Sequence, residues 1–297
     1  MSNLFTEDTY EQAVIELFEG MGYEHIYAPD YDRDYTSPFL DAVLYGSLLR
    51  INRNLPEEAV KEAILKLKNF DMGSLLQKNI IFMDYLQNGI TVKILVKGEE
   101  QSVIVRLVDY GTVDNNSFCV VNQFTFLENG NNRRPDIILF INGMPLVLME
   151  LKSPSKDEVG VENAYHQIRN YMQDIPSMFY YNAICVVSDL STNKAGTITS
   201  GLDRFMEWKT KDGNYEETSY AQFDTFYEGM FQKKRLLDIL KNFILFSGTG
   251  TGRFKVLAGY HQYFAVRKAI EKAKIATKTD GKGGVFWHTQ GSGKSLS

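Results

Sequence analysis

Two short apolar runs joined by a turn sequence constrain the fold of this chain more than any other feature. The runs are Ile137–Ile141 and Leu146–Met149, and the intervening Asn142-Gly143-Met144-Pro145 contains the Asn-Gly pair that is typical of tight hairpin turns. Neither run alternates apolar with polar residues, so both strands are expected to be buried on both faces. The sequence therefore predicts a hairpin that lies inside the protein core.

Charged residues stand at the outer ends of this hairpin. Asp136 precedes the first run, and Glu150 and Lys152 follow the second. A two-residue turn at Asn142-Gly143 would place Asp136 opposite Met149 and point it away from Glu150, because a one-residue slip turns a side chain to the other face. A three-residue loop with Gly143 in the left-handed conformation, or a bulge with the same result, would put the three charged residues on one face. We expect one of these two arrangements.

Such a set of side chains points to hydrolysis of phosphodiester bonds. Two carboxylates that converge on one point repel each other unless a cation lies between them, and hard oxygen ligands suit Mg²⁺ or Mn²⁺. Lys152 on the same face would orient the attacking water or neutralise charge that develops on the phosphate. The alternative interpretation is an exposed strand end that carries a structural ion pair.

A second pair of polar residues lies on the helix predicted over Val161–Asp174. Gln167 and Tyr171 are four residues apart, so they share one face of this helix. A Gln amide and a Tyr hydroxyl there could hold a DNA phosphate and order the metal site. The alternative is an amphipathic helix with Tyr171 partly in the core.

The end of the chain carries a pattern typical of a phosphate-binding loop. A strand-like run, Gly284–Trp287, leads into Gly291-Ser292-Gly293-Lys294-Ser295, in which the glycines would let backbone N–H groups approach phosphates. Lys294 would neutralise the β and γ phosphates of ATP, and Ser295 would ligate Mg²⁺. The general pattern has Gly where this chain has His288, and a chance glycine-rich loop is the alternative. Upstream, Gln262 could hydrogen-bond an adenine edge, although a surface helix residue is the commoner interpretation.

These residues resemble known families. Asp136, Glu150 and Lys152 are similar to the PD-(D/E)XK nuclease superfamily, and Gln167 with Tyr171 matches the Gln-x-x-x-Tyr element of its RecB-like branch. The resemblance implies that Asp136, Glu150 and the Leu151 carbonyl hold the divalent metal. It also implies an acidic residue on an N-terminal helix. Glu11 is the candidate, with Glu7 and Glu16 also possible and a solvated helix face as the alternative.

The order of the motifs resembles the R (restriction, motor) subunit of type I restriction enzymes, since a nuclease site precedes a loop similar to that of superfamily 2 helicases. The strongest stretch is Thr279–Ser295, and Asn116–Phe124 and Arg204–Lys209 also resemble this family. The resemblance implies an ATP-driven motor that pulls double-stranded DNA, a cut far from the recognition site, and separate specificity and methylation subunits. We expect an N-terminal fragment that does not turn over ATP by itself, because the chain stops before the remaining ATPase motifs.

Two other functions are compatible with the motifs. One is a non-cleaving DNA translocase or remodelling ATPase with a degenerate nuclease-like module, and the intact acidic pair and lysine argue against it. The other is a stand-alone PD-(D/E)XK repair nuclease, which the phosphate loop disfavours.

Composition agrees with a cytoplasmic enzyme. At 297 residues and 44% hydrophobic content the chain can bury a substantial core. Cys119 and Cys185 lie in apolar runs and are expected to be buried, reduced thiols. The sequence has no signal peptide and no apolar span of roughly 18 residues, so neither secretion nor membrane association is expected. The net charge of −5 conceals an acidic N-terminus, and we expect weak DNA binding from this chain alone.

The predicted elements describe an α/β fold, a mixed β-sheet flanked by helices with the beginning of a RecA-like motor domain. Helices are predicted around Glu11, over Pro56–Ile64, over Leu75–Leu86 and over Tyr220–Phe246; strands besides the hairpin are predicted over Thr91–Val96, Val103–Val108, Phe118–Phe126 and Ala183–Val187. Ser247–Gly252 is typical of a linker. We therefore predict a nuclease domain over residues 1–250 and a truncated ATP-binding domain over 251–297.

Overall fold

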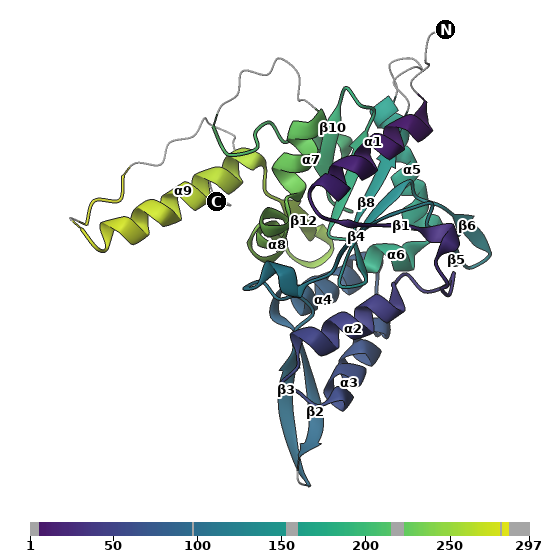
Figure 1. The fold of residues 1–297 in the computed structure, drawn as a ribbon, viewed down its shortest axis with the longest axis vertical. Helices are drawn as coiled ribbons and strands as arrows, with labels where there is room; N and C mark the ends of the chain where they lie inside the picture. Colours follow the sequence, from purple (N-terminus) through teal and green to yellow (C-terminus); the bar gives the residue numbers. More distant parts are fainter. Residues whose placement is uncertain (1–5, 97, 153–159, 215–222, 280, 285–297) are drawn as a thin grey trace.

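The computed structural model describes residues 6–96, 98–152, 160–214, 223–279 and 281–284 (Figure 1). The helices are α1 (Glu7–Gly20), α2 (Asp41–Ile51), α3 (Glu57–Lys68), α4 (Leu75–Asn88), α5 (Gly160–Asp174), α6 (Pro176–Tyr180), α7 (Phe223–Phe231), α8 (Lys233–Asn242) and α9 (Tyr260–Ala276). The strands are β1 (Glu24–Tyr27), β2 (Ile90–Val96), β3 (Glu99–Val105), β4 (Phe118–Asn122), β5 (Phe126–Glu128), β6 (Asn131–Arg133), β7 (Ile137–Ile141), β8 (Met144–Leu151), β9 (Ile184–Ser188), β10 (Asn193–Gly196), β11 (Ile244–Ser247) and β12 (Phe254–Leu257).

A six-stranded sheet with the order β1-β4-β7-β8-β9-β10 forms the centre of the molecule. The sheet is mixed, because β1 runs parallel to β4 and β8 parallel to β9 while the other neighbours are antiparallel. The hydrophobic core on one face includes α1 and α7, and the core on the other face includes α5 and α6. The predicted mixed sheet flanked by helices is therefore confirmed.

The central hairpin β7–β8 is buried along its whole length, as its apolar sequence predicts. Its turn has two residues, because Ile141 pairs with Met144 and both Asn142 and Gly143 have positive φ, 51° and 77°. The three-residue loop was therefore a wrong prediction. A Cβ atom at Gly143 would lie 2.5 Å from the Leu44 backbone nitrogen, so the tight turn against α2 needs glycine.

A bulge restores the register that the tight turn would otherwise break. The pairing moves from Phe140 with Pro145 to Leu139 with Val147, which leaves Leu146 as the extra residue of β8. From there Ile137 pairs with Met149, and one further step sets Asp136 opposite Glu150. The second predicted arrangement, a bulge that places the charged residues on one face as a three-residue loop would, is therefore confirmed.

Residues 6–88 are mostly helical, as predicted, but they also contain the strand β1 of the central sheet, which was not predicted; strands follow from residue 90. Helix α1 begins after Thr6, whose side chain accepts a hydrogen bond from Thr9 N, and Gly22 follows it with φ of 83°. Strands β2 and β3 form a separate ribbon that extends from the body of the molecule (Figure 1). The strand predicted from Val103 begins earlier, at Glu99, because the whole of β3 pairs with β2.

The segment before the predicted domain boundary differs from expectation. The helical pattern ends at Asn242 rather than Phe246, because Ile244–Ser247 pairs as β11 with β12. Ser247–Gly252, predicted as a linker, forms the end of β11 and the turn of this hairpin, and Leu257 and Tyr263 beyond it join the main hydrophobic core. The boundary between residues 250 and 251 remains a prediction.

Three smaller expectations can be compared with the structure. Cys119 and Cys185 are buried free thiols, as predicted. Among the described residues, no helix is both long and apolar enough to cross a membrane. The phosphate-loop residues Gly291, Ser292, Gly293, Lys294 and Ser295 lie outside the residues that the structure describes.

Candidate active site

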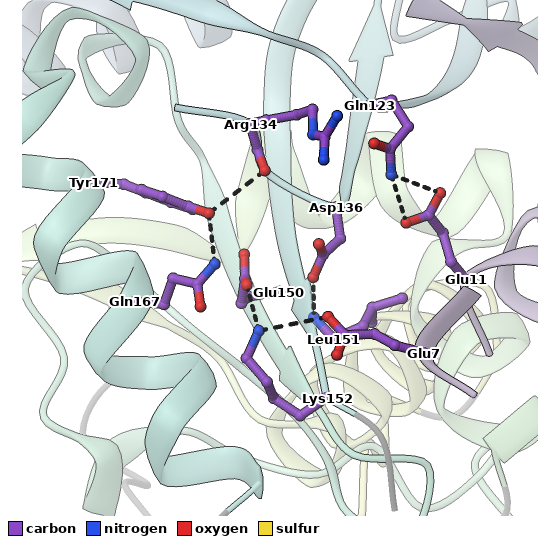
Figure 2. Close-up of polar contacts among 10 residues, drawn as sticks. All are labelled: Glu7, Glu11, Gln123, Arg134, Asp136, Glu150, Leu151, Lys152, Gln167 and Tyr171. Carbon is purple, nitrogen blue, oxygen red and sulfur yellow. Dashed lines mark hydrogen bonds and ion pairs between the residues drawn. The ribbon is translucent and has the colours of Figure 1, made fainter. Parts of the chain in front are cut away.

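The bulged hairpin brings the two predicted carboxylates and the lysine together at the end of β8. Asp136 directly precedes β7, and its Oδ2 accepts a 2.7 Å hydrogen bond from the backbone N–H of Leu151 (Figure 2). Glu150 lies near the end of β8, and its Oε1 accepts a 2.6 Å hydrogen bond from Lys152 Nζ. The three side chains therefore share one face of the sheet, which is the arrangement that the active-site prediction requires.

The carboxyl groups of this cluster are shielded from solvent to different degrees, Glu150 being buried and Asp136 half-buried. Glu150 has no exposed surface, and its Oε2 has no hydrogen-bond partner within the described part of the chain. Burial, and then the nearby Asp136 carboxylate, raise the pKa of Glu150 well above its usual range. Burial also raises the pKa of Asp136 to about 6, although the hydrogen bond from the Leu151 N–H acts in the opposite direction and lowers it. A buried carboxylate oxygen without a donor fits a position for a cation.

Lys152 carries the positive charge of the cluster. Its side chain is 20% exposed, and Nζ lies 2.6 Å from Glu150 Oε1 and 3.8 Å from Glu7 Oε1 of helix α1. Burial disfavours the charged ammonium, but the Glu150 carboxylate and the hydrogen bond to it outweigh burial, so the pKa of Lys152 is raised. Lys152 is therefore an ammonium group at neutral pH. Glu7, an alternative to Glu11 in the sequence, is the α1 residue that contacts Lys152.

Glu11 is held by two amide side chains rather than by solvent. It is 9% exposed, and its Oε1 accepts hydrogen bonds from Asn122 Nδ2 at 2.7 Å and Gln123 Nε2 at 3.2 Å. The interpretation of Glu11 as a solvated helix face was therefore wrong. In the part of the chain that the structure describes, no three His, Cys, Asp or Glu side chains are grouped to hold a metal, so Glu11 is not a third carboxylate ligand in this arrangement.

Gln123 is a site residue to which the sequence had assigned no role. It follows β4 with φ of 56°, in the left-handed region that side chains other than glycine rarely adopt. Its backbone N–H donates to the Asp136 carbonyl at 3.4 Å, and its side chain donates to Glu11. Gln123 therefore links the strand that carries Asp136 to the helix that carries Glu11. Two amides directly after the apolar run of β4 are the only signal that the sequence gives.

Gln167 and Tyr171 share one face of α5, as predicted, and they bond to each other. Gln167 Nε2 donates to the Tyr171 hydroxyl at 2.6 Å, and that hydroxyl donates to the Arg134 carbonyl at 3.5 Å (Figure 2). Tyr171 is only 5% exposed, and burial raises its pKa, so the phenol keeps its proton. Tyr171 thus also lies in the core, as the alternative interpretation held. The pair holds the backbone two residues before Asp136.

Gln262 lies in the first turn of α9, far along the chain from this cluster. It is 9% exposed, so its interpretation as a surface helix residue was wrong. Its Oε1 accepts a 2.9 Å hydrogen bond from the Gly259 N–H, and it lines a cavity of about 300 Å³ together with Phe243 and Arg267. The amide oxygen is therefore already engaged at the start of the helix.

Comparison with known proteins assigns most of the chain to one family. Residues 4–204 match the family described as "Type I restriction enzyme R protein N terminus", and residues 261–297 match the family described as "SWI2/SNF2 ATPase". The chain is 34% identical to the type I restriction enzyme HindI endonuclease subunit of Haemophilus influenzae over 99% of its own length and 29% of that protein. It is 30% identical to the putative type I restriction enzyme MjaIXP endonuclease subunit of Methanocaldococcus jannaschii over 97% of its length and 30% of that protein.

The chain thus spans about 30% of the length of these two relatives. The first family match covers more than half of the chain and includes every residue of the carboxylate and lysine cluster as well as Glu11, Gln167 and Tyr171. On this evidence, the chain belongs to the family of type I restriction enzyme R protein N-termini.

Proposed function

We propose that this chain is the DNA-cutting part of a type I restriction endonuclease subunit, with a core of the PD-(D/E)XK type. It hydrolyses phosphodiester bonds of double-stranded DNA at the cluster of Asp136, Glu150 and Lys152. The observation that supports this proposal most directly is the bulge in β8, which sets Asp136 opposite Glu150 although the turn alone would separate them. A structural ion pair would need only Glu150 and Lys152, and would not call for a second, half-buried carboxylate beside them.

The acidic residues of the cluster fit a divalent metal. Asp136, Glu150 and the Leu151 carbonyl would hold Mg²⁺ or Mn²⁺, which suits the unpaired Glu150 Oε2 and the unfavourable burial of both carboxylates. When bound, the metal supplies Lewis-acid stabilisation of charge on the phosphate. Its presence would also keep both carboxyl groups ionised at neutral pH.

The other residues of the site then have separate tasks. Lys152 positions the attacking water and stabilises negative charge on the phosphate, because its ammonium is fixed by Glu150 at 2.6 Å. Glu11, held by Asn122 and Gln123, supports the metal site from helix α1. Gln167 and Tyr171 fix the backbone at Arg134, and thereby the position of the segment that leads into Asp136.

The end of the chain is proposed to begin an ATP-driven motor. The match of residues 261–297 to SWI2/SNF2 ATPases supports a RecA-like domain in which Gln262 contacts adenine and Gly291–Ser295 binds the phosphates of ATP with Mg²⁺. In the whole protein this motor would pull double-stranded DNA, and specificity and methylation subunits would select the site. The printed names of the relatives, which are endonuclease subunits of type I restriction enzymes, support this assembly.

The test uses the full-length subunit assembled with its proposed partner subunits. Asp136→Ala and Lys152→Ala should each abolish DNA cleavage while DNA-stimulated ATP hydrolysis and translocation continue. The matched control is Asp203→Ala, because the Asp203 carboxylate is 78% exposed and pairs with the exposed Arg204. Cleavage that survives both cluster substitutions would exclude this site, and a wild-type assembly that translocates DNA without cutting it would favour the non-cleaving remodelling ATPase.

A further inference from the structure

A polar groove opens beside Arg134 and Tyr171, whose contact lies two residues before Asp136. Its volume is about 670 Å³. It is lined by Asn132, Arg133, Arg134, Asn163, His166, Gln167, Asn170 and Tyr171. No Asp or Glu is among these lining residues, although the chain as a whole has 37 acidic and 32 basic residues. The groove is therefore a surface rich in hydrogen-bond donors next to an acidic site.

One wall of the groove is the exposed face of α5. Asn163, His166 and Asn170 are exposed and lie three or four residues apart, so they form one row along the helix. The row is about 10 Å long at 1.5 Å per residue. Gln167 and Tyr171 are less exposed than this row, and the Tyr171 hydroxyl contacts the Arg134 carbonyl two residues before Asp136. This row of two amides and one imidazole therefore leads toward the cluster of Asp136 and Glu150.

The opposite wall supplies positive charge. Arg133 pairs with Asp174 at 2.7 Å, so its charge is balanced. Arg134 is exposed, and its guanidinium makes no hydrogen bond or ion pair with another residue that the structure describes. Figure 2 shows this guanidinium on the side of Asp136 and Gln123, away from Gln167 and Tyr171. An exposed guanidinium at the end of the groove near Asp136 suits an anion with several oxygen acceptors.

We propose that this groove binds the sugar-phosphate backbone of the strand that is cut, next to the scissile phosphate. The inference rests on the proposed nuclease function and extends it to a substrate surface. A row of about 10 Å matches about three nucleotides at roughly 3.4 Å per nucleotide. Amide and guanidinium groups on an open wall contact phosphate and sugar oxygens, so this surface positions DNA without reading its sequence.

The test measures DNA binding by the 297-residue chain. The probe is a fluorescent duplex of about 20 base pairs at about 50 mM salt, with Ca²⁺ in place of Mg²⁺. The variant Arg134→Gln/Asn170→Ala should raise Kd about tenfold and reduce the dependence of log Kd on log salt by about 1, because one phosphate contact is lost. The matched control is Arg53→Gln/Asn54→Ala, an exposed Arg-Asn pair after α2, which lies well apart from α5 (Figure 1).

The possible results separate this proposal from the proposed function. Equal Kd values for the groove variant and the control variant, or no detectable binding by the unmodified chain, would overturn the groove. A groove variant that binds weakly supports the groove even if the full-length subunit shows no cleavage that depends on Asp136, and in that case only the nuclease assignment fails. Circular dichroism melts of both variants show whether the substitutions change the fold, which none of these exposed side chains should do.

Discussion

Lys152 and Lys255 have surroundings that are opposite in character, and Lys152 is partly exposed whereas Lys255 is buried. Lys152 lies against the Glu150 carboxylate, which raises its pKa. Lys255, on β12, is 2% exposed and donates to Asn79 Oδ1 at 3.0 Å and to the Asn182 carbonyl at 2.7 Å. These partners are neutral, so burial dominates and lowers the pKa of Lys255 to about 7.

The difference distinguishes the proposed metal site from a structural contact. Around Lys255 the buried polar atoms have partners: Asn79 donates to three backbone carbonyls and accepts from Lys255. Around Lys152 one buried oxygen lacks a partner, because no residue that the structure describes donates a hydrogen bond to Glu150 Oε2. An unsatisfied buried carboxylate destabilises the fold unless something binds there, whereas a satisfied network needs no further partner.

The largest effect is expected for Glu150→Gln, which keeps the size of the side chain but removes its charge. Cleavage by the full-length subunit should fall on the order of 10⁴-fold, because an amide is a poor metal ligand. The free energy of unfolding without metal should rise by about 1 kcal/mol, since a buried carboxylate is replaced by a neutral group. Denaturant unfolding of the chain in the presence of a chelator measures the second quantity. A variant that is less stable than the wild type under these conditions would show that the acidic cluster is structural, like the Lys255 network.

Lys255→Met tests the other side of the comparison through pH. The pKa of Lys255 is lowered from 10.5 to about 7. Between these values the unfolded chain binds a proton that the folded chain does not, so this lysine makes the wild type more stable as pH rises. From pH 6 to pH 9 its contribution should increase by about 3 kcal/mol, and Lys255→Met should lack this increase.

Urea unfolding at several pH values measures this slope, with the exposed Lys272→Met as control. Lys255→Met should lose some stability at every pH because it lacks the contacts to Asn79 and Asn182, but only the slope of stability against pH reports the charge of Lys255. Parallel pH profiles for wild type and Lys255→Met would mean that Lys255 stays charged in the fold, and the contrast with Lys152 would disappear.

These residues also show what the sequence could and could not predict. The pair Asp136 and Glu150 was predictable because a local hairpin places both, and the apolar runs define that hairpin within fifteen residues. The register was only narrowed to two options, because the choice between a longer loop and a bulge depends on how the turn packs against α2. Lys255 gave no signal, because its partners Asn79 and Asn182 are far away in the chain. The strand β11 was predicted as helix up to Phe246, although its partner β12 follows it closely in the chain.

The smallest effect is expected at Gln123, where the site and its support meet. Gln123→Ala removes the amide donor to Glu11 and leaves the backbone contact to Asp136 in place. Supporting hydrogen bonds of this kind typically change metal affinity or activity by 10- to 100-fold, and we expect about tenfold because Asn122 still donates to Glu11. The cleavage rate should therefore be recovered at higher Mg²⁺ concentration. Gln123→Gly is the control for backbone strain. Like alanine, glycine lacks the amide donor, but it adopts the left-handed conformation of residue 123 without strain. If Gln123→Ala lowers the free energy of unfolding but leaves the Mg²⁺ dependence of cleavage unchanged, Gln123 stabilises the fold and does not support the metal site. Its role would then be structural, like that of Lys255.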